Sequence, residues 1–365
     1  MTAMRDDREP ARLKRIVSKF RNLRVVVLGD LMLDRYIWGT AHRLSPEAAV
    51  PIVDFKSQND FLGGAGNVAA NLRGLGARVE AFGVVGGRHD GPKKIVDDEP
   101  GAVLRSRLHK EAIEEKSVIA DPRRVTTVKT RVIARQQQIV RVDQEQTDGI
   151  SSELEEQLFR RLLASLKAAD AVVLSDYDKG LISDTFTDRV LRACSSVRVP
   201  VFVKPKAARL IPYPGARAII CNTKEAETYA GRALRDGTAV GEAGSTLLGR
   251  FGSAAVIITR GAEGMMVFEE GSPRALDISA TSHEVSYARV GQRGVERSAQ
   301  GRQVFDVTGA GDTVLSALAI ASVAGATIGQ SAHIANVAAG VVVGKLGTAT
   351  VRPDELSAAL DEAHL

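Results

Sequence analysis

Short runs of β-branched and aliphatic residues recur along the chain, and this recurrence restricts the possible folds more than any other feature. The run RVVVLGD at 24–30 shows no alternation of apolar and polar residues, which is typical of a strand buried on both faces. Comparable runs lie at 169–177, 199–205, 216–222 and 253–261. Each of these segments is therefore predicted to be a central strand of a sheet.

The stretches between these runs have the length and spacing of helices, as at 151–168 and 183–196. Strand, helix and strand in regular succession predict a parallel sheet that is covered by helices. Right-handed crossovers place helices on both faces, so we expect an α/β fold, a three-layer α/β/α sandwich with a mostly parallel central sheet. In such sheets, ligands bind at the carboxyl ends of the strands.

Three segments depart from this pattern. Residues 47–62 and 125–143 contain pieces in which apolar and polar residues alternate, and we expect them to form a small β lid. Residues 272–303 are rich in Gly and Arg and are expected to be a surface insertion. The predicted organisation is an N-terminal helical extension over 1–21, one domain over 22–353 and a C-terminal helix over 354–365.

The composition is that of a globular protein and argues against several kinds of partner. No apolar run reaches the roughly 20 residues that cross a bilayer, so no membrane partner is expected. The net charge of +5 is spread along the chain and aromatic residues make up only 4%, so no nucleic-acid partner is expected. The charged first 20 residues lack the apolar core of a signal peptide, and the chain has two cysteines. We therefore expect a cytoplasmic protein.

The sequence VFDVTGAGDTVLSALAIA at 304–321 gives the clearest indication of chemistry. Apolar residues at helical spacing follow Gly309, Ala310 and Gly311, which are therefore predicted to lie at a helix N-terminus. Such an end attracts anions, and small side chains let a phosphoryl group approach the backbone. Asp312 would then accept a proton from an attacking hydroxyl, as phosphoryl transfer requires. The alternative is that Asp312 only caps a helix whose small residues serve packing.

Two glycine-rich blocks, LGGAGN at 62–67 and DVTGAGDT at 306–313, stand far apart in the chain. Further distinctive blocks are GDLMLDRYIWG (29–39), LSPEAAVPIV (44–53), TVKTRVIARQQQIVRVD (127–143), VVLSDYDKG (172–180) and CNTKEAE (221–227). Together they resemble the ribokinase-like (PfkB) sugar kinases and, within that family, the D-glycero-β-D-manno-heptose 7-phosphate kinases. The resemblance extends over about residues 22 to 353 and implies the ribokinase-like fold.

The resemblance also implies roles for individual residues. Asp312 matches the catalytic base of the family, and Gly309, Ala310 and Gly311 match its anion hole. The residues that match nucleotide-binding positions are Asn222, Thr223, Lys224, Glu225, Thr259, Gly261, Gly264, His333 and Asn336. The residues that match sugar contacts are Asp34, Gly63, Gly64 and Asn67. Glu225 is expected to help to hold Mg²⁺.

The activity implied by the resemblance is that of an ATP- and Mg²⁺-dependent kinase. It would transfer the γ-phosphate to the anomeric hydroxyl of D-glycero-D-manno-heptose 7-phosphate and so give the 1,7-bisphosphate for ADP-heptose and lipopolysaccharide core synthesis. Lid strands of the family often pair two subunits, so a homodimer through these strands is expected. Two alternatives stay open, namely a ribokinase-like kinase for a different sugar or sugar phosphate, and a non-catalytic sugar or nucleotide sensor of the same fold.

A phosphorylated substrate requires cations in its binding site. The predicted lid segment supplies Lys129, Arg131, Arg135 and Arg141, and the block SDYDKG supplies Lys179. We hypothesise that one or more of Arg131, Arg141 and Lys179 hold the 7-phosphate, because guanidinium and ammonium groups bind phosphate oxygens. The alternative is that they are solvated charges on a lid strand.

One position departs from the family pattern. Family members commonly have Asp-Pro-Lys where this chain has Lys204-Pro205-Lys206. The difference replaces an acid by a base at the carboxyl end of a predicted strand, near the expected phosphate and metal zone. Two effects are open: weaker handling of Mg²⁺, or an additional contact to phosphate.

Overall fold

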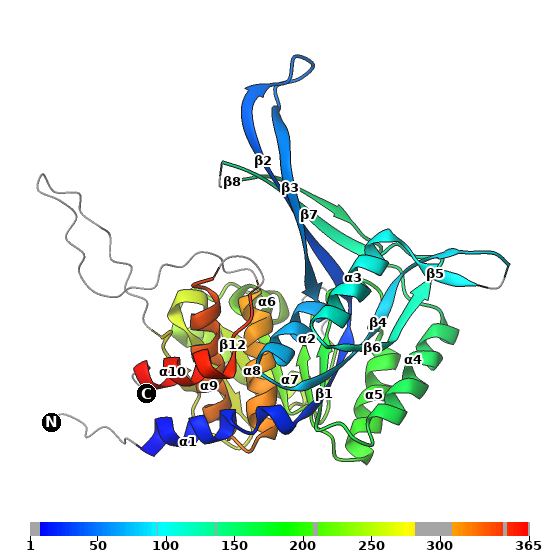
Figure 1. Ribbon diagram of the computed structural model, residues 1–365. Helices are drawn as coiled ribbons and strands as arrows, with labels where there is room; N and C mark the ends of the chain where they lie inside the picture. Colours follow the sequence, from blue (N-terminus) through cyan, green and yellow to red (C-terminus); the bar gives the residue numbers. More distant parts are fainter. Residues whose placement is uncertain are drawn as a thin grey trace, which may run out of the picture. The chain divides into compact units, whose positions relative to one another are not determined.

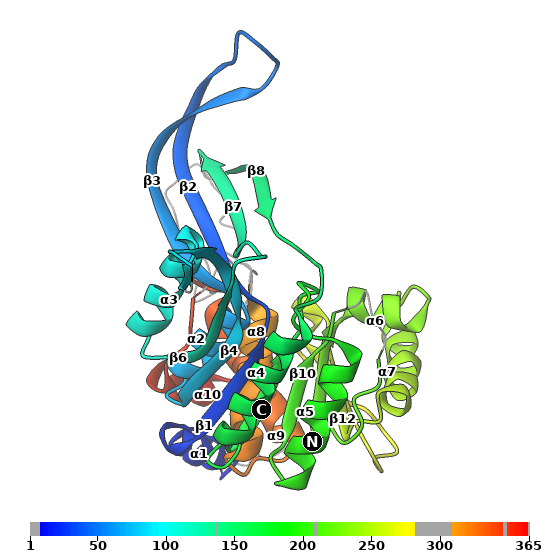
Figure 2. The same ribbon diagram turned by 90° about the vertical axis from the view of Figure 1, so that its right-hand side faces the viewer.

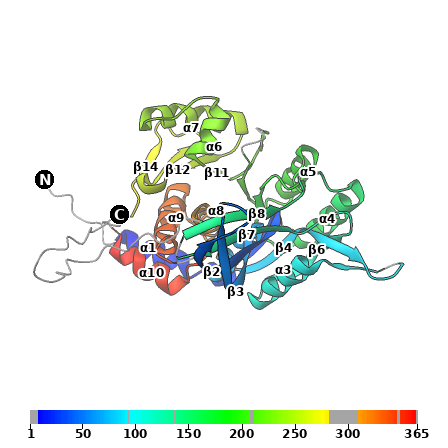
Figure 3. The same cartoon turned by 90° about the horizontal axis from the view of Figure 1, so that it is seen from above.

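The computed structural model describes residues 8–92, 94–135, 137–206, 211–281, 309–345 and 349–363. Contacts between residues group the chain into two compact units. Unit 1 comprises Met1–Leu23, Gly74–Ala77 and Pro200–Leu365, and unit 2 comprises Arg24–Arg73 and Arg78–Val199. In both units, strands form a central layer and helices lie on its two sides (Figures 1 and 3).

The sheet of unit 2 is built around β1 (Arg24–Gly29). This strand pairs in parallel with β4 (Arg78–His89) on one side and with β9 (Ala171–Ser175) on the other. β6 (Glu114–Asp121) pairs in parallel with β4, and β5 (Ile95–Asp97) pairs antiparallel with the end of β4. Every residue of β1 after the first is buried, which explains its unbroken apolar sequence.

Helices cover both faces of this sheet. The top view shows α3 on one side of β4 and β6, and α4 and α5 together on the other (Figure 3). The helices of unit 2 are α2 (Ala65–Gly74), α3 (Glu99–Lys110), α4 (Ser152–Ser165) and α5 (Asp184–Ser196). The helices predicted over 151–168 and 183–196 are confirmed as α4 and α5.

Unit 2 also holds a second sheet, in which the strand order is β3-β2-β7-β8 (Figure 2). The long antiparallel hairpin of β2 and β3 extends beyond the ends of β7 and β8 (Figure 1). The strands are β2 (Leu31–Leu44), β3 (Pro51–Gly64), β7 (Thr127–Ala134) and β8 (Gln137–Gln144). The exposed apolar side chains of this second sheet include Phe55, Val140 and Val142. A homodimer through these strands stays a prediction.

The segments predicted for this sheet are found in it, with changed bounds. Residues 125–143 contain β7 and most of β8, whereas 47–62 begins in the connection before β3. The sequence did not predict β2, which starts a single residue after β1 ends. Because β1 and β2 follow one another without a glycine- or proline-rich break, the change from one sheet to the other leaves little trace in the sequence.

Unit 1 has a mixed sheet. β10, β11 and β12 run parallel to one another, and β13 and β14 continue the sheet antiparallel. The strands are β10 (Val201–Lys204), β11 (Ala218–Asn222), β12 (Ala255–Thr259), β13 (Met265–Glu269) and β14 (Leu276–Ile278). β14 lies inside the expected insertion 272–303, of which residues 282–303 are outside the described part of the chain.

The helices of unit 1 lie on two sides of this sheet. In the top view, α6 and α7 are on one side of β11 and β12, and α8 and α9 are on the other (Figure 3). The helical elements are α1 (Arg8–Val17), η1 (Phe20–Asn22), α6 (Thr223–Ala230), α7 (Gly237–Phe251), η2 (Gly261–Glu263), α8 (Ala310–Val323), α9 (Ile328–Val342) and α10 (Pro353–Glu362). None of the helices in the described ranges is both long and apolar enough to cross a membrane.

Candidate active site

The N-terminus of α8 has a form that suits an anion. Gly309 precedes the helix with a φ of +83°, a left-handed conformation that glycine adopts without strain. The N–H groups of Asp312 and Thr313 donate to the Gly309 carbonyl at 2.9 and 3.0 Å, and within the described residues no side chain caps this end. We call residues 309–311 the glycine turn. The structure thus places the glycine turn at a helix N-terminus, as the sequence predicts, while residues 306–308 of the same motif lie outside the described residues.

Asp312 follows the glycine turn and is only 5% exposed. Its Oδ1 accepts a hydrogen bond from the ammonium of Lys204 at 2.6 Å, so the two side chains form an ion pair. Lys204 is the last residue of β10, and its Nζ lies 3.5 Å from the point that a Cβ on Gly311 would occupy. The ammonium is therefore beside both the carboxylate and the glycine turn. To act as a base, Asp312 has to present an oxygen to the acceptor hydroxyl. It can do so with its other oxygen while the hydrogen bond to Lys204 stays, or with Oδ1 after this hydrogen bond is broken.

The block that begins at Asn222 forms the start of α6. The Asn222 side chain accepts from the Glu225 N–H, and Glu225 Oε2 accepts from the Asn222 N–H, each at 2.8 Å. This capping box fixes both side chains at the carboxyl end of β11. Thr223 donates to the Thr259 carbonyl at 3.3 Å, which ties the block to the end of β12. Lys224 lies in the same first turn and is exposed.

The two glycines after Thr259 enclose a tight turn. Gly261 and Gly264 begin and follow η2 with φ values of +58° and +87°. A Cβ on Gly264 would lie 2.0 Å from the Ile278 carbonyl oxygen, so a side chain is excluded there. Both glycines therefore have a backbone reason for their identity, and this reason is independent of a nucleotide.

His333 and Asn336 lie three residues apart on α9 and so share one side of the helix. Asn336 is nearly buried and donates to the Ser279 carbonyl at 2.8 Å, just beyond β14. Burial lowers the pKa of His333, although the charge of Glu9 opposes this shift. The net shift of the His333 pKa favours the uncharged imidazole.

The residues of unit 1 fit a Mg²⁺ that takes most of its ligands from outside the protein. Within the ranges described, no group of three or more His, Cys, Asp or Glu is arranged to hold a metal ion. Glu225 offers a single carboxylate, one oxygen of which is engaged in the capping box. Mg²⁺ is commonly bound through one or two carboxylates, several waters and substrate phosphates. A donor set of this kind is compatible with Glu225 as the protein ligand.

In unit 2, Asp34 is held between a glycine and an arginine. A Cβ on Gly63 would lie 2.4 Å from Asp34 Oδ2, so only a glycine fits opposite this carboxylate. Arg131 donates from Nη1 to Asp34 Oδ1 at 2.5 Å, and its guanidinium lies over the Tyr36 ring, 5.2 Å from the centroid. Burial disfavours the charge of Arg131, but the Asp34 carboxylate outweighs it, so the pKa of Arg131 is raised.

The other two residues of the predicted sugar set lie at the junction of β3 and α2. Gly64 has a φ of +55°, and a Cβ there would lie 2.5 Å from the Asp30 carbonyl oxygen. Asn67 is buried in the first turn of α2, where its Oδ1 accepts from the Asn71 side chain at 3.2 Å. Gly63 and Gly64 thus bring α2 and Asn67 close to the carboxyl end of β1.

The cations proposed for the 7-phosphate gather with three carboxylates on one part of unit 2. Arg131 and Arg141 are directly opposite on β7 and β8, and so are Lys129 and Asp143. The ion pairs are Arg131–Asp34 (2.5 Å), Arg141–Asp143 (2.9 Å), Lys129–Asp143 (3.1 Å), Lys129–Glu145 (3.2 Å) and Lys179–Glu145 (2.9 Å). We call these four cations and three carboxylates the second-sheet cluster. Each of the three predicted phosphate ligands has a carboxylate partner. The side chains of Arg131 and Lys179 are largely buried, whereas that of Arg141 is half-exposed, as a solvated charge on a lid strand would be.

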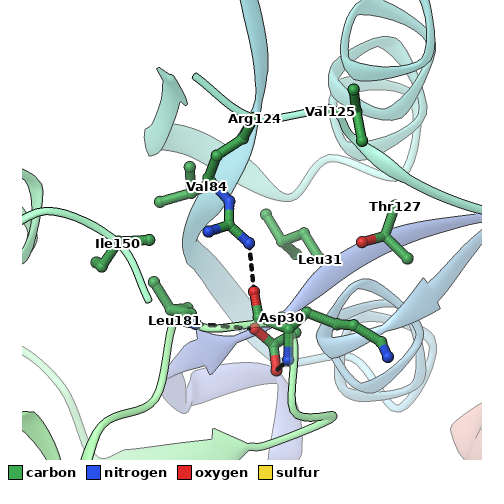
Figure 4. Close-up of a pocket in the computed structure, with 9 residues that line it drawn as sticks. Asp30, Leu31, Val84, Arg124, Val125, Thr127, Ile150 and Leu181 are labelled. Atoms are coloured by element: carbon green, nitrogen blue, oxygen red, sulfur yellow. Dashed lines mark hydrogen bonds between the residues drawn. The ribbon is translucent and has the colours of Figure 1, made fainter. Parts of the chain in front are cut away.

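A small pocket lies beside Lys179 and is lined by Asp30, Leu31, Val84, Arg124, Val125, Thr127, Ile150, Lys179 and Leu181 (Figure 4). Asp30 is buried and accepts the N–H groups of Tyr177, Lys179 and Leu181 at 2.8, 3.2 and 3.3 Å. Arg124 reaches into the pocket toward Asp30 and donates to the Lys179 carbonyl at 2.5 Å (Figure 4). The loop that carries Lys179 is therefore held on both sides of its backbone.

Sequence reasoning missed Arg124, Asp143 and Glu145. A signal for the two carboxylates is present, because residues 141, 143 and 145 alternate and alternate residues of a strand share one face. The register of β8 against β7 then decides which cations they meet, and this register is not visible in a single strand. Arg124 gives no such signal, since it contacts the carbonyls of residues 146, 148 and 179 from a loop.

Comparison with known proteins identifies sequence relatives of the chain. The model of the pfkB family of carbohydrate kinases matches residues 22–355. The chain is 39% identical over 356 residues to the bifunctional protein HldE of Geotalea uraniireducens, and 40% identical over 342 residues to that of Geobacter sulfurreducens. These matches include 98% and 94% of this chain but only 66% and 64% of the two relatives, so the chain spans about two thirds of their length.

Solved structures share the fold at low sequence identity. Arabidopsis thaliana ribokinase, complexed with ribose and ATP, superposes with a TM-score of 0.68 at 18% identity, over 93% of this chain and 98% of the ribokinase. Phosphofructokinase-2 from Escherichia coli, in complex with substrates and products, gives a TM-score of 0.71 at 15% identity, over 94% and 99% of the two chains. The ribokinase-like α/β fold expected from the sequence is confirmed. The chain belongs to the pfkB family of carbohydrate kinases.

Proposed function

We propose that the protein transfers the γ-phosphate of ATP to the anomeric hydroxyl of D-glycero-D-manno-heptose 7-phosphate and so produces the 1,7-bisphosphate. The observation that carries this proposal is the glycine turn at the start of α8, followed directly by the buried carboxylate of Asp312. The motifs that resemble heptose 7-phosphate kinases and the similarity to two proteins named HldE support the choice of sugar. The product would serve ADP-heptose and lipopolysaccharide core synthesis in the cytoplasm, where ATP is available.

The residues of unit 1 have separate parts in this reaction. Backbone N–H groups of the glycine turn would stabilise the negative charge on the transferred phosphoryl group. Asp312 would take the proton of the anomeric hydroxyl as the new oxygen–phosphorus bond forms and the bond to ADP breaks. Asn222, Thr259 and the α9 pair His333 and Asn336 would bind the nucleotide. Mg²⁺ near Glu225 would neutralise charge on the phosphates.

The residues of unit 2 would recognise the sugar phosphate. Asp34 and Asn67 offer fixed polar atoms for sugar hydroxyls, because both side chains are buried and hydrogen-bonded. One or more of Arg131, Arg141 and Lys179 would hold the 7-phosphate by exchanging a carboxylate of the second-sheet cluster for phosphate oxygens. Because phosphate oxygens would replace a carboxylate, the affinity for the sugar should depend on the negative charge of its phosphate.

One observation favours a second candidate, a kinase of this family for a different sugar phosphate. Three carboxylates offset three of the four positive charges of the second-sheet cluster, so its fit to a 7-phosphate rather than to another anionic sugar is not dictated by charge alone. The Lys204–Asp312 ion pair is compatible with the other alternative, a non-catalytic sensor of the same fold, because a sensor does not need Asp312 as a base. Both alternatives are decided by the same assay.

The test is ADP release from ATP with heptose 7-phosphate, compared with a panel of hexose and pentose phosphates. We expect the highest kcat/KM for the heptose, and a loss of at least about 10³-fold in kcat for Asp312→Asn, since this change removes the base but keeps the size of the side chain. A higher kcat/KM for another sugar phosphate would establish the second candidate. If no sugar phosphate gave ADP release, the non-catalytic sensor would be the remaining alternative.

A further inference from the structure

The ammonium of Lys204 lies beside the glycine turn at the start of α8. Its side chain is 17% exposed, and its ammonium lies between the carboxylate of Asp312 and the glycine turn. A buried ion pair contributes little to stability, because removing both charges from water costs about as much as their attraction returns. Packing alone thus gives no reason for a lysine at the end of β10.

The surroundings of the ammonium favour an anion. The helix N-terminus of α8 carries a partial positive charge, and Gly311 leaves the space beside Lys204 Nζ free of a side chain. A phosphate that approaches the glycine turn would therefore come within reach of this ammonium. Lysine is a common ligand of phosphate because its charge is compact and its donors rotate freely.

We propose that Lys204 binds the γ-phosphate of the nucleotide and, in doing so, exchanges its contact with Asp312 for phosphate oxygens. This inference rests on the proposed function. While no nucleotide is bound, the ammonium holds the carboxylate at the glycine turn. With ATP bound, the ammonium moves to the γ-phosphate and Asp312 is left to accept the proton of the sugar hydroxyl. Lys204 keeps its proton throughout, so the bonds that form and break in the reaction are unchanged.

A lysine at this position changes what the metal has to do. The aspartate of the family pattern that the sequence resembles would bring a negative charge to this position, and a further cation would be needed to offset it beside the phosphates. Lys204 brings a positive charge from the protein itself. Part of the affinity for the γ-phosphate should accordingly persist in this chain when divalent metal is removed.

The experiment measures binding of ATP and of ADP by calorimetry in EDTA, without sugar. For Lys204→Met we expect the Kd for ATP to rise about tenfold and the Kd for ADP to change less than about threefold, because only ATP has the γ-phosphate. Lys204→Arg keeps a cation and should bind ATP within about threefold of the unmodified chain. Lys14→Met is the matched control, since Lys14 forms an ion pair of the same 2.6 Å length with Asp361 in unit 1.

An unchanged Kd for ATP in Lys204→Met would overturn the inference, as would an equal loss for ATP and ADP. Unfolding temperatures show whether the variant is folded, and Lys204→Gln carries the same comparison if the methionine variant is not. Failure of the proposed function is seen separately. In that case the unmodified chain would bind ATP in a Lys204-dependent way but would phosphorylate none of the sugar phosphates.

Discussion

Asp30 shows how a single carboxylate can organise the loop that carries Lys179, one of the cations proposed for the phosphate. It is 4% exposed, at the carboxyl end of β1, and three N–H groups of residues 177–181 donate to it. Burial raises the pKa of Asp30 to about 6, and the neighbouring Asp176 adds to this shift, although the N–H donors oppose it. The loop of Lys179 thus depends on a group that changes its charge between pH 4 and 7.

This shift predicts a pH dependence of stability. The folded chain holds the Asp30 proton more tightly than an unfolded carboxyl with a pKa of 3.8, so the contribution is fully present below about pH 4 and is lost as the pH rises through 6. Roughly two pH units at about 1.4 kcal/mol each correspond to on the order of 3 kcal/mol. As the pH rises from 4 to 7, the free energy of unfolding of the unmodified chain, measured with denaturant, should fall by about this much relative to that of Asp30→Asn. Parallel curves for the two proteins would contradict the shift.

At the scale of elements, the candidate site of unit 1 consists mainly of helix ends. α6 starts with a capping box, whereas α8 starts with a left-handed glycine and no side-chain cap among the described residues. A side-chain cap satisfies N–H groups of a first turn, and a helix end without one presents its backbone rather than a side chain to an anion. The two helix ends therefore differ in what they can bind: α6 presents the Asn222 and Glu225 side chains, and α8 presents backbone.

Loss of a cap can be separated from loss of a ligand contact. Asn222→Ala should lower the free energy of unfolding by about 1 kcal/mol because the α6 cap is lost, and should also lower kcat/KM for ATP by about tenfold. Ser183→Ala is the matched control, since Ser183 caps α5 by accepting from the Phe186 N–H at 3.1 Å. We expect the control to lose similar stability in denaturant melts and to keep its kcat/KM. An equal loss of activity in both variants would show that Asn222 acts only through the fold.

The elements that could be predicted from the sequence are those whose signal is local. β1 is buried on both faces and gives an unbroken apolar run, and the glycine turn reveals the start of α8 in three residues. β2 could not be predicted, because its burial changes from complete at Leu31 to slight at Leu44 and no single periodicity describes it. The Lys204–Asp312 pair joins residues 108 positions apart, so the sequence could show an unusual lysine but not its partner.

At the scale of the whole molecule, the predicted ligand sets fall into different units. The glycine turn, Asp312, Lys204, the α6 cap and the α9 pair all belong to unit 1, whereas Asp34, Asn67 and the second-sheet cluster belong to unit 2. Two of the ion pairs each join residues of one unit: Lys204 pairs with Asp312 in unit 1, and Arg131 pairs with Asp34 in unit 2. Binding of the nucleotide and of the sugar phosphate should therefore be separable by mutation.

Lys179→Met tests this separation. It removes the cation of the Lys179–Glu145 pair in unit 2, so we expect the Kd for heptose 7-phosphate to rise about tenfold while the Kd for ATP, measured without sugar, stays within about twofold. Lys204→Met in unit 1 should do the opposite, since its ammonium faces the glycine turn. Calorimetry with one ligand at a time measures both. If Lys179→Met weakened ATP as much as the sugar phosphate, Lys179 would belong to the nucleotide contacts, and the assignment of the 7-phosphate to the second-sheet cluster would rest on Arg131 and Arg141 alone.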